Sequence, residues 1–156
     1  MIIRQPDQSQ LADIIAINHL AASYSEAMCR FAIDEAVQTY ATDGVLSSPT
    51  TEDAVGRAAI AAVIGKTVSG LDFVFQTLHQ GLVDVDGDCA TTHFTITEWA
   101  RRTADGRGIL FLGAYRDEVV RTEDGWRFAR RQLIPRTMGR PEFLTGKVHD
   151  LSITPE

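Results

Sequence analysis

Apolar and polar residues follow two different periods along this chain, a helical period in the first half and a strand period in the second. Apolar side chains recur every three or four residues from Leu11 onward, which predicts a first helix capped by Asp7 or Ser9. The same spacing predicts a second, short helix over about 34–41 and a third helix after Gly56. The first part of the chain is therefore expected to be mainly helical.

From residue 71 onward the period of the pattern shortens from about 3.6 residues to 2, the period of a β-strand. This part predicts long strands over 73–85, 90–101, 109–120 and 126–134, and the earlier stretch predicts a short strand at 45–46 and a polar loop over 50–53. Asp124-Gly125 predicts a tight hairpin turn, because glycine tolerates the positive φ that such turns need. Helices first and antiparallel strands second indicate the α+β class.

The composition indicates the class of protein but does not indicate its function. A chain of 156 residues, 44% hydrophobic and 23% charged, fits a single globular domain over 1–156. A formal charge of −6 and a pI near 5.2 argue against general affinity for nucleic acid or anionic membrane. No apolar run approaches the length of a membrane span, no secretory signal is visible, and Cys29 and Cys89 are expected to be reduced thiols in a cytoplasm.

Several short motifs keep a fixed order over about residues 11–136. They are Tyr24, Tyr40 with Asp43, Pro49, Gly56, His79, Asp86-Gly87-Asp88-Cys89-Ala90, Gly113-Ala114-Tyr115 and Asp124-Gly125-Trp126-Arg127-Phe128. Together with the order of elements, they resemble the SnoaL-like branch of the nuclear-transport-factor-two-like superfamily, which includes polyketide cyclases, scytalone dehydratase and a hexachlorocyclohexane dehydrochlorinase. The resemblance implies a cone-shaped, curved antiparallel sheet, an α+β barrel, closed by the N-terminal helices around a pocket, with residues 137–156 as a tail.

The resemblance places a pocket histidine at His79, where it would act as a general base beside an acidic residue. An imidazole titrates near neutrality, so it can take a proton from carbon or give one to a leaving oxygen. His79 shares its strand parity with Phe73, Phe75 and Thr77, which predicts that this set faces inward and that Phe75 lines the substrate pocket. The alternative is a hydrogen-bonded core histidine without chemistry.

At the acidic partner of His79, this sequence departs from the resembling enzymes. The position where the resembling enzymes carry their aspartate falls near Arg30, and the nearest acids are Glu26 and Asp34. Asp34 is taken as the catalytic partner. An inward Arg30 would suit an anionic substrate or an oxyanion, and otherwise it is a solvated charge on a helix face.

Four further residues are candidates for the pocket. Tyr24 and Tyr115 could donate phenol hydroxyls to a substrate oxygen, with Tyr24 counted among the catalytic residues, or they could be core aromatics. His93 and Trp99 share one strand face with three threonines, and pattern alone allows that face to be inside or outside. No carboxylate stands at ligand spacing from the histidines, so no metal and no cofactor are predicted.

The predicted function is a small-molecule lyase or isomerase of the dehydratase or cyclase type, which transfers protons on an apolar oxygenated substrate. The alternative is a non-catalytic domain that binds a small molecule or a partner. A homo-oligomer is expected because five apolar residues take the parity opposite to the predicted pocket face, namely Phe94, Ile96, Leu110, Leu112 and Val120. The arginines of the last strand, Arg127, Arg130, Arg131 and Arg136, are expected to pair across strands with acids such as Asp117.

Overall fold

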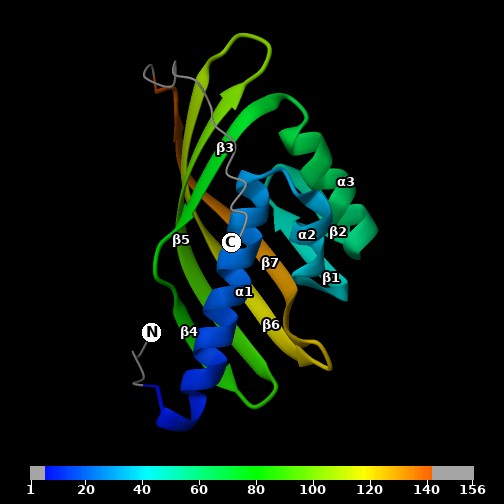
Figure 1. Ribbon diagram of the computed structural model, residues 1–156, viewed down its shortest axis with the longest axis vertical. Coiled ribbons are helices and arrows are strands. Elements are labelled where there is room, and N and C mark those ends of the chain that lie inside the picture. Colours follow the sequence, from blue (N-terminus) through cyan, green and yellow to red (C-terminus); the bar gives the residue numbers. More distant parts are fainter. Residues whose placement is uncertain (1–5, 142–156) are drawn as a thin grey trace, which may run out of the picture.

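The computed structural model describes residues 6–141 (Figure 1). Its helices are a 3₁₀ turn η1 (Gln8–Gln10), α1 (Leu11–Cys29), α2 (Ile33–Gln38) and α3 (Arg57–Val68). Its strands are β1 (Tyr40–Ser48), β2 (Thr51–Val55), β3 (Leu71–Leu78), β4 (Leu82–Asp86), β5 (Cys89–Arg102), β6 (Gly108–Thr122) and β7 (Gly125–Gly139).

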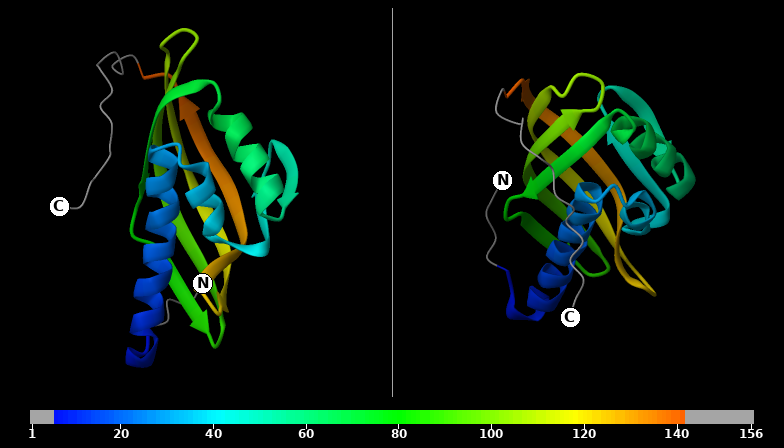
Figure 2. Two further views of the ribbon diagram at one scale, coloured as in Figure 1. Left: turned by 45° about the vertical axis from the view of Figure 1, so that its right-hand side comes forward. Right: turned by 45° about the horizontal axis from the view of Figure 1, so that its top comes forward.

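The strands form one seven-stranded sheet in the order β2-β1-β7-β6-β5-β3, and β4 also pairs with β5. All pairs are antiparallel except β1 with β7, which is parallel. Figures 1 and 2 show the sheet curving around the helices, so that α1 and α2 lie in its hollow. The α+β class and the cone of curved, mostly antiparallel sheet are confirmed.

Helix α1 begins and packs as its sequence predicts. Asp7 accepts a hydrogen bond from the backbone N–H of Ser9 at 2.9 Å and caps the 3₁₀ turn that leads into the helix. Its buried residues recur at helical spacing, as in Ile17, Leu20 and Tyr24. None of the helices among residues 6–141 is long and apolar enough to span a membrane.

Two elements between the first and third helices differ from the prediction. Helix α2 ends at Gln38, and Tyr40 begins β1, a strand far longer than the predicted one at 45–46. Tyr40 pairs with Phe128 of β7, whose backbone N–H donates to Thr39 O at 2.9 Å. This long-range pairing overrides the local helical pattern. The predicted polar loop over 50–53 is mostly strand, since β2 begins at Thr51.

The predicted strand over 73–85 is two strands, β3 and β4, which pair with consecutive parts of β5. Between them the chain crosses directly over Phe94, and a Cβ built on Gly81 would overlap the Phe94 ring. Only glycine fits so close an approach. The break therefore has a steric cause that the alternation of polar and apolar residues does not reveal.

Gly81→Ala is expected to lower the free energy of unfolding by about 1–3 kcal/mol, the usual cost of overpacking. The Phe94 side chain is 2% exposed, so it has no room to move away from the new methyl group. Urea unfolding of the variant measures this effect. Gly70→Ala is the matched control, because a Cβ there meets no atom within 4 Å; equal stabilities of the two variants would contradict the steric explanation.

Candidate functional site in the cone

The inner face of the sheet is the one that the sequence assigned to the outside. On β3 the buried residues are Val74 and Gln76, whereas Phe75 is 43% exposed. On β5, Phe94 and Ile96 are each 2% exposed. The predicted inward face of β3 and the predicted outward position of Phe94 and Ile96 are therefore wrong, because the even-numbered residues of β3 and β5 face the helices.

The two candidate histidines lie on the outer face of the sheet. His79, just beyond β3, is exposed, and its ring Nε2 lies 3.0 Å from the hydroxyl of Thr97. His93 and Trp99 share the outer parity of Thr97 on β5. Neither histidine lies next to the polar residues of the interior. Within residues 6–141, no acidic side chain is hydrogen-bonded to His79.

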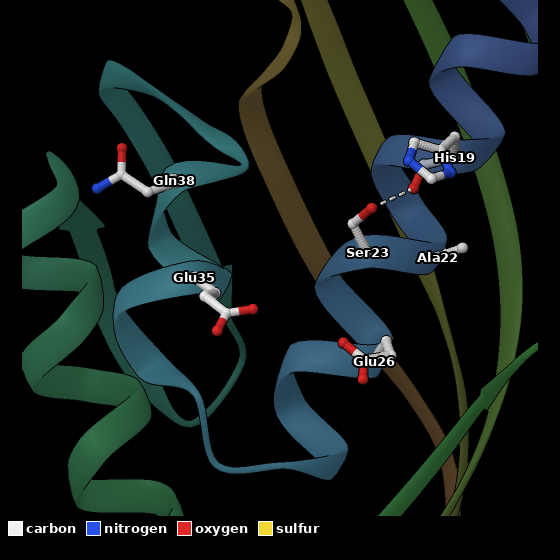
Figure 3. A pocket seen from close by; sticks show the side chains of 6 residues that line it. All are labelled: His19, Ala22, Ser23, Glu26, Glu35 and Gln38. Atoms are coloured by element: carbon white, nitrogen blue, oxygen red, sulfur yellow. Dashed lines mark hydrogen bonds between the residues drawn. The ribbon is translucent and has the colours of Figure 1, made fainter. Parts of the chain in front are cut away.

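The predicted acids and Arg30 lie on the surface of the helices. Arg30 Nε donates to Glu26 at 2.6 Å, and its guanidinium also bonds Glu35. Asp34 is exposed at the start of α2. Figure 3 shows Glu26 and Glu35 on the facing sides of α1 and α2, where they border a surface hollow of about 560 Å³ that also meets His19. For Arg30, the interpretation as a charge on a helix surface holds.

A buried ion pair lies at the centre of the cone. Arg131 donates from Nε and Nη2 to the carboxylate of Asp117 at 2.9 and 2.8 Å, and both side chains are 0% exposed. Thr92 adds a third hydrogen bond to Asp117 at 2.9 Å. Cross-strand pairing of Arg131 was predicted, but its place inside the cone was not.

A β-bulge explains why Arg131 points inward. The pairing of β6 with β7 shifts register between Glu118 and Val119, so that Val119 pairs with Phe128 while Glu118 pairs with Arg130. One residue of β7, Ala129, has no counterpart, and an extra residue reverses which side chains face inward. Phe128 and Arg131 are consequently both buried on the same face, although a regular strand would separate them.

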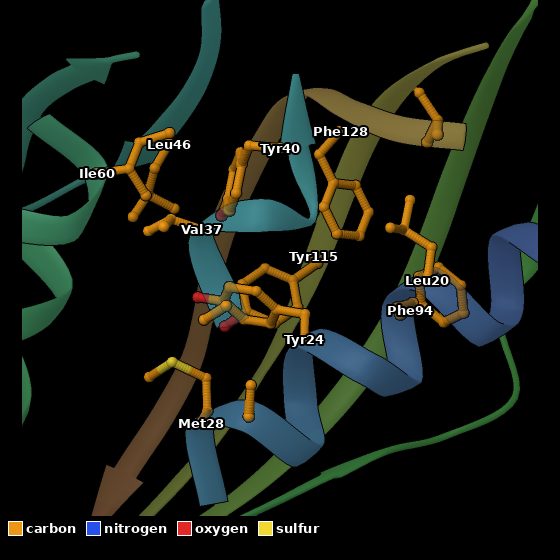
Figure 4. Packing of buried hydrophobic residues seen from close by; sticks show 14 of the residues in the cluster. Leu20, Tyr24, Met28, Val37, Tyr40, Leu46, Ile60, Phe94, Tyr115 and Phe128 are labelled. Carbon is orange, nitrogen blue, oxygen red and sulfur yellow. The ribbon is translucent and has the colours of Figure 1, made fainter. Parts of the chain in front are cut away.

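Aromatic rings surround the Arg131 guanidinium. Its Cζ lies 3.8 Å from the ring centroid of Phe128, 4.1 Å from that of Tyr115 and 4.6 Å from that of Tyr24. Tyr24 meets both Tyr115 and Tyr40 edge to face at 6.0 Å. Burial raises the pKa of all three tyrosines, so their hydroxyls stay protonated and can act as donors. Figure 4 shows the three rings packed together between α1 and the sheet.

A second carboxyl group, that of Glu98, lies nearer the edge of this cluster. Glu98, on the inner parity of β5, is partly exposed and accepts a hydrogen bond from Gln76 Nε2 at 2.8 Å. The same Gln76 nitrogen lies 3.3 Å from the Tyr115 hydroxyl. Burial raises the pKa of Glu98, and the hydrogen bond from Gln76 only partly opposes this.

Helix α1 closes over Gln76 with two small side chains. Ser25 Oγ donates to the Gln76 carbonyl at 2.9 Å, and the Gln76 backbone N–H donates to Cys29 Sγ at 3.1 Å. Burial raises the pKa of the Cys29 thiol, which therefore stays protonated. The interior thus combines an acid, an amide, three phenols and a paired guanidinium. Among residues 6–141, no group of three or more His, Cys, Asp or Glu could hold a metal ion.

Sequence analysis named Tyr24 and Tyr115 as candidates for the interior but missed Gln76 and Glu98. It expected Arg131 and Asp117 only to pair across strands, not to lie inside the cone. Glu98 lies on the same strand face as Phe94 and Ile96. If the sequence analysis had assigned that face to the inside, an acidic residue on it would have indicated a functional group in the cone. No pattern would have placed Arg131, because its direction depends on the bulge at Ala129.

A cone of curved, mostly antiparallel sheet, with helices in its hollow and polar groups inside, defines the nuclear-transport-factor-two-like class of proteins. The SnoaL-like domain family matches residues 9–132, and the chain belongs to this family. An uncharacterized protein of Mycobacterium tuberculosis is 26% identical over 125 residues, which cover 79% of this chain and 85% of that protein.

Solved structures share the fold at low sequence identity. A Novosphingobium aromaticivorans protein, provisionally named an aromatic ring hydroxylase, superposes with a TM-score of 0.79 at 23% identity over 88% of this chain and 96% of its own. A hexachlorocyclohexane dehydrochlorinase of type 2 gives a TM-score of 0.79 at 12% identity over 87% and 93%. These similarities show the fold and leave the activity to the residues inside the cone.

Proposed function

We propose that this protein is a small-molecule lyase or isomerase that moves a proton within the cone, and that Glu98 is the group that carries the proton. The observation behind the proposal is a carboxyl group on the inner face with a raised pKa and a neutral amide, Gln76, as its hydrogen-bond partner. A carboxyl group whose pKa is shifted toward neutrality can both accept and return a proton at physiological pH.

The surroundings of Glu98 support proton transfer on an apolar oxygenated molecule. Gln76 holds the carboxyl group in position, and the phenols of Tyr24 and Tyr115 can stabilise negative charge on an oxygen. The side chains that pack around this cluster are aromatic and aliphatic, which suits a largely apolar frame. His79 lies on the outer face of the sheet, away from these groups. We therefore assign to Glu98 the role of general base that the sequence predicted for His79.

The comparisons support a proton-transfer reaction in a general way. A dehydrochlorinase removes hydrogen chloride from its substrate, and the solved dehydrochlorinase shares the fold of this chain. Elimination of this kind begins with a base that takes a proton from carbon. The proposal extends that type of chemistry to this chain through a different residue.

Deuterium exchange tests the proposal without knowledge of the natural substrate. The protein would be incubated in D₂O with 1-indanone, 1-tetralone, 2-tetralone and 2-cyclohexenone, and uptake of deuterium next to the carbonyl would be followed by NMR. We expect the native protein to accelerate exchange in at least one ketone, Glu98→Gln to lose this activity, and His79→Ala to keep it. Equal exchange by native protein and Glu98→Gln would contradict the role of Glu98.

The alternative function is a domain that binds a small molecule without turnover. In its favour, the His79 ring is hydrogen-bonded to the Thr97 hydroxyl, and the Arg131 guanidinium is already paired with Asp117. Such a domain would be stabilised by the ketones in a thermal melt but would not exchange their protons.

We also propose that the protein is a homo-oligomer that uses the outer face of the sheet. Phe75, Trp99 and Leu110 lie in one row across β3, β5 and β6, and Leu112 lies in the next row. A continuous apolar row on an open sheet face is typical of an interface. Light scattering at micromolar concentration is expected to give at least twice the monomer mass, and Phe75→Glu to reduce it; a monomeric native protein would contradict the proposal.

A further inference from the structure

Helix α1 takes the place of a neighbouring strand along the edge of β3. Strand β3 pairs with β5 on one side, and on its other side there is no strand among residues 6–141. Gln76 lies opposite Glu98 in this pairing, and its backbone N–H and C=O point away from β5, because both bond side chains of α1. In an antiparallel sheet, pairs of this kind bring the two side chains closest together. The register therefore brings the Gln76 amide to the Glu98 carboxyl group.

Two side chains one turn apart on α1 make these bonds to the backbone of Gln76. Ser25 Oγ donates to the Gln76 carbonyl oxygen at 2.9 Å, and Cys29 Sγ accepts from the Gln76 N–H at 3.1 Å. A serine inside a helix commonly donates to the carbonyl four residues earlier, as Ser23 does to His19 at 2.8 Å. Ser25 donates to β3 instead, and it is only 5% exposed. Its hydroxyl therefore joins the helix to the strand.

The amide of Gln76 is held at its nitrogen end. Nε2 lies 2.8 Å from Glu98 Oε2 and 3.3 Å from the Tyr115 hydroxyl, whereas Oε1 is buried without a hydrogen-bond partner within the described part of the chain. No hydrogen bond to the oxygen end from residues 6–141 thus helps to orient the amide. Its position depends on where the backbone of Gln76 is held, and the bonds from α1 determine that.

The hydrogen bond from Gln76 stabilises the ionised form of Glu98. The charge of Glu98 acts on three titratable groups, the Tyr24 and Cys29 side chains of α1 and the Tyr115 side chain of β6, and burial keeps all three neutral by raising their pKa. Burial raises the pKa of Glu98 as well, and the bond from Gln76 lowers it. Movement of the amide away from the carboxyl group should therefore favour the protonated form.

We propose that Ser25 and Cys29 are positioning residues for Glu98: by holding the backbone of Gln76, they keep its amide against the carboxyl group that carries the proton. This inference rests on the proposed function, because it explains how the proton-carrying group of that site is held in place. It gives α1 a part in the chemistry, since the helix controls how readily Glu98 ionises.

A carbon-13 NMR titration of Glu98 tests this role. In Ser25→Ala the ionisation equilibrium of Glu98 is expected to shift about two- to fivefold toward the protonated form, so that its pKa rises; adding Cys29→Ala should extend the shift to about three- to tenfold. Ser25→Thr keeps the hydroxyl and should keep the native pKa. Ser23→Ala is the matched control, because it removes a hydroxyl of the same helix that bonds within the helix, and it should leave the pKa of Glu98 unchanged.

A purely structural role of Ser25 would give a different result. Ser25→Ala would then lower the melting temperature while the pKa of Glu98 stays at its native value, and this result would overturn the inference. A fall in the pKa of Glu98 would overturn it as well, because loss of a donor to the carboxylate can only favour the protonated form.

The pH profile of deuterium exchange separates this inference from the proposed function. A general base must be ionised, so exchange of the fastest ketone by Ser25→Ala should reach its plateau at a higher pH than exchange by the native protein. Exchange that depends on Glu98, with the same pH profile and the same Glu98 pKa in Ser25→Ala and native protein, would keep the proposed function and overturn the inference. A raised pKa in Ser25→Ala, without any Glu98-dependent exchange, would keep the positioning role and remove the proposed proton transfer.

Discussion

Asp117→Asn is expected to lower the free energy of unfolding by about 3–5 kcal/mol, the usual cost of breaking a buried ion pair. The substitution keeps the size of the side chain but leaves the Arg131 guanidinium without a counter-charge where both side chains are 0% exposed. An unpaired buried cation carries its full desolvation cost. Urea unfolding followed by circular dichroism measures the loss, which corresponds to a fall in melting temperature of about 10 °C or more.

A surface ion pair provides the control for Asp117. Asp53 accepts from Arg130 at the same distance as the buried pair, 2.8 Å, but the side chains are 43% and 37% exposed. Asp53→Asn should therefore cost less than about 1 kcal/mol. The double variant Asp117→Leu with Arg131→Met should recover most of the stability lost in Asp117→Asn, since it removes both charges. Equal costs for Asp53→Asn and Asp117→Asn would mean that Arg131 is solvated.

Glu98→Gln is expected to reduce the rate of deuterium exchange by roughly 10²- to 10⁴-fold, which corresponds to about 3–5 kcal/mol of barrier. Glutamine preserves the shape of the side chain but cannot take a proton from carbon. Initial exchange rates of the fastest ketone measure the effect. Asp72→Asn, which breaks an exposed pair with Arg101, is the control and should keep the native rate.

The same variant should change the pH dependence of stability. Because the pKa of Glu98 is raised in the folded state, the native protein holds this proton more tightly than the unfolded chain does. Native stability should therefore fall as the pH rises from the ordinary glutamate value of about 4.3 to the raised pKa of Glu98. In Glu98→Gln this contribution to the slope should be absent, while the fold is retained.

The sequence predicted the fold well because the spacing of apolar residues within each segment agrees with the helix or strand that the segment forms. The helical spacing after Leu11, the Asp124-Gly125 turn and the long period-2 strands each reappear in the structure within a few residues. The errors occur where distant segments meet. Tyr40 leaves the predicted helix to pair with Phe128, and the strand over 73–85 breaks where Gly81 crosses Phe94. Such contacts have no local signature in the sequence.

The candidate site was harder to predict because alternation leaves the choice of face open. His79 and Thr77 were assigned inward, but the register with β5 puts Gln76 inside. Glu98 was not recognised as a candidate for the same reason: it shares its strand parity with Phe94 and Ile96, which were predicted to face outward. Arg131 illustrates a second limit, since a single unpaired residue in β7 reverses its direction. Tyr24 and Tyr115 were found because aromatic residues in a small domain are buried in most arrangements.

The most direct test of a proton-carrying group in the cone is the titration of Glu98 itself. Carbon-13 NMR of the glutamate side-chain carboxyls, with Glu98→Gln to assign the signal, gives the pKa of this residue in the native protein. The account predicts a pKa above the ordinary value for glutamate, because the partial burial of Glu98 raises its pKa by more than the hydrogen bond from Gln76 lowers it. A pKa at or below that ordinary value would contradict the role of Glu98 and, with it, the proposed chemistry of the cone.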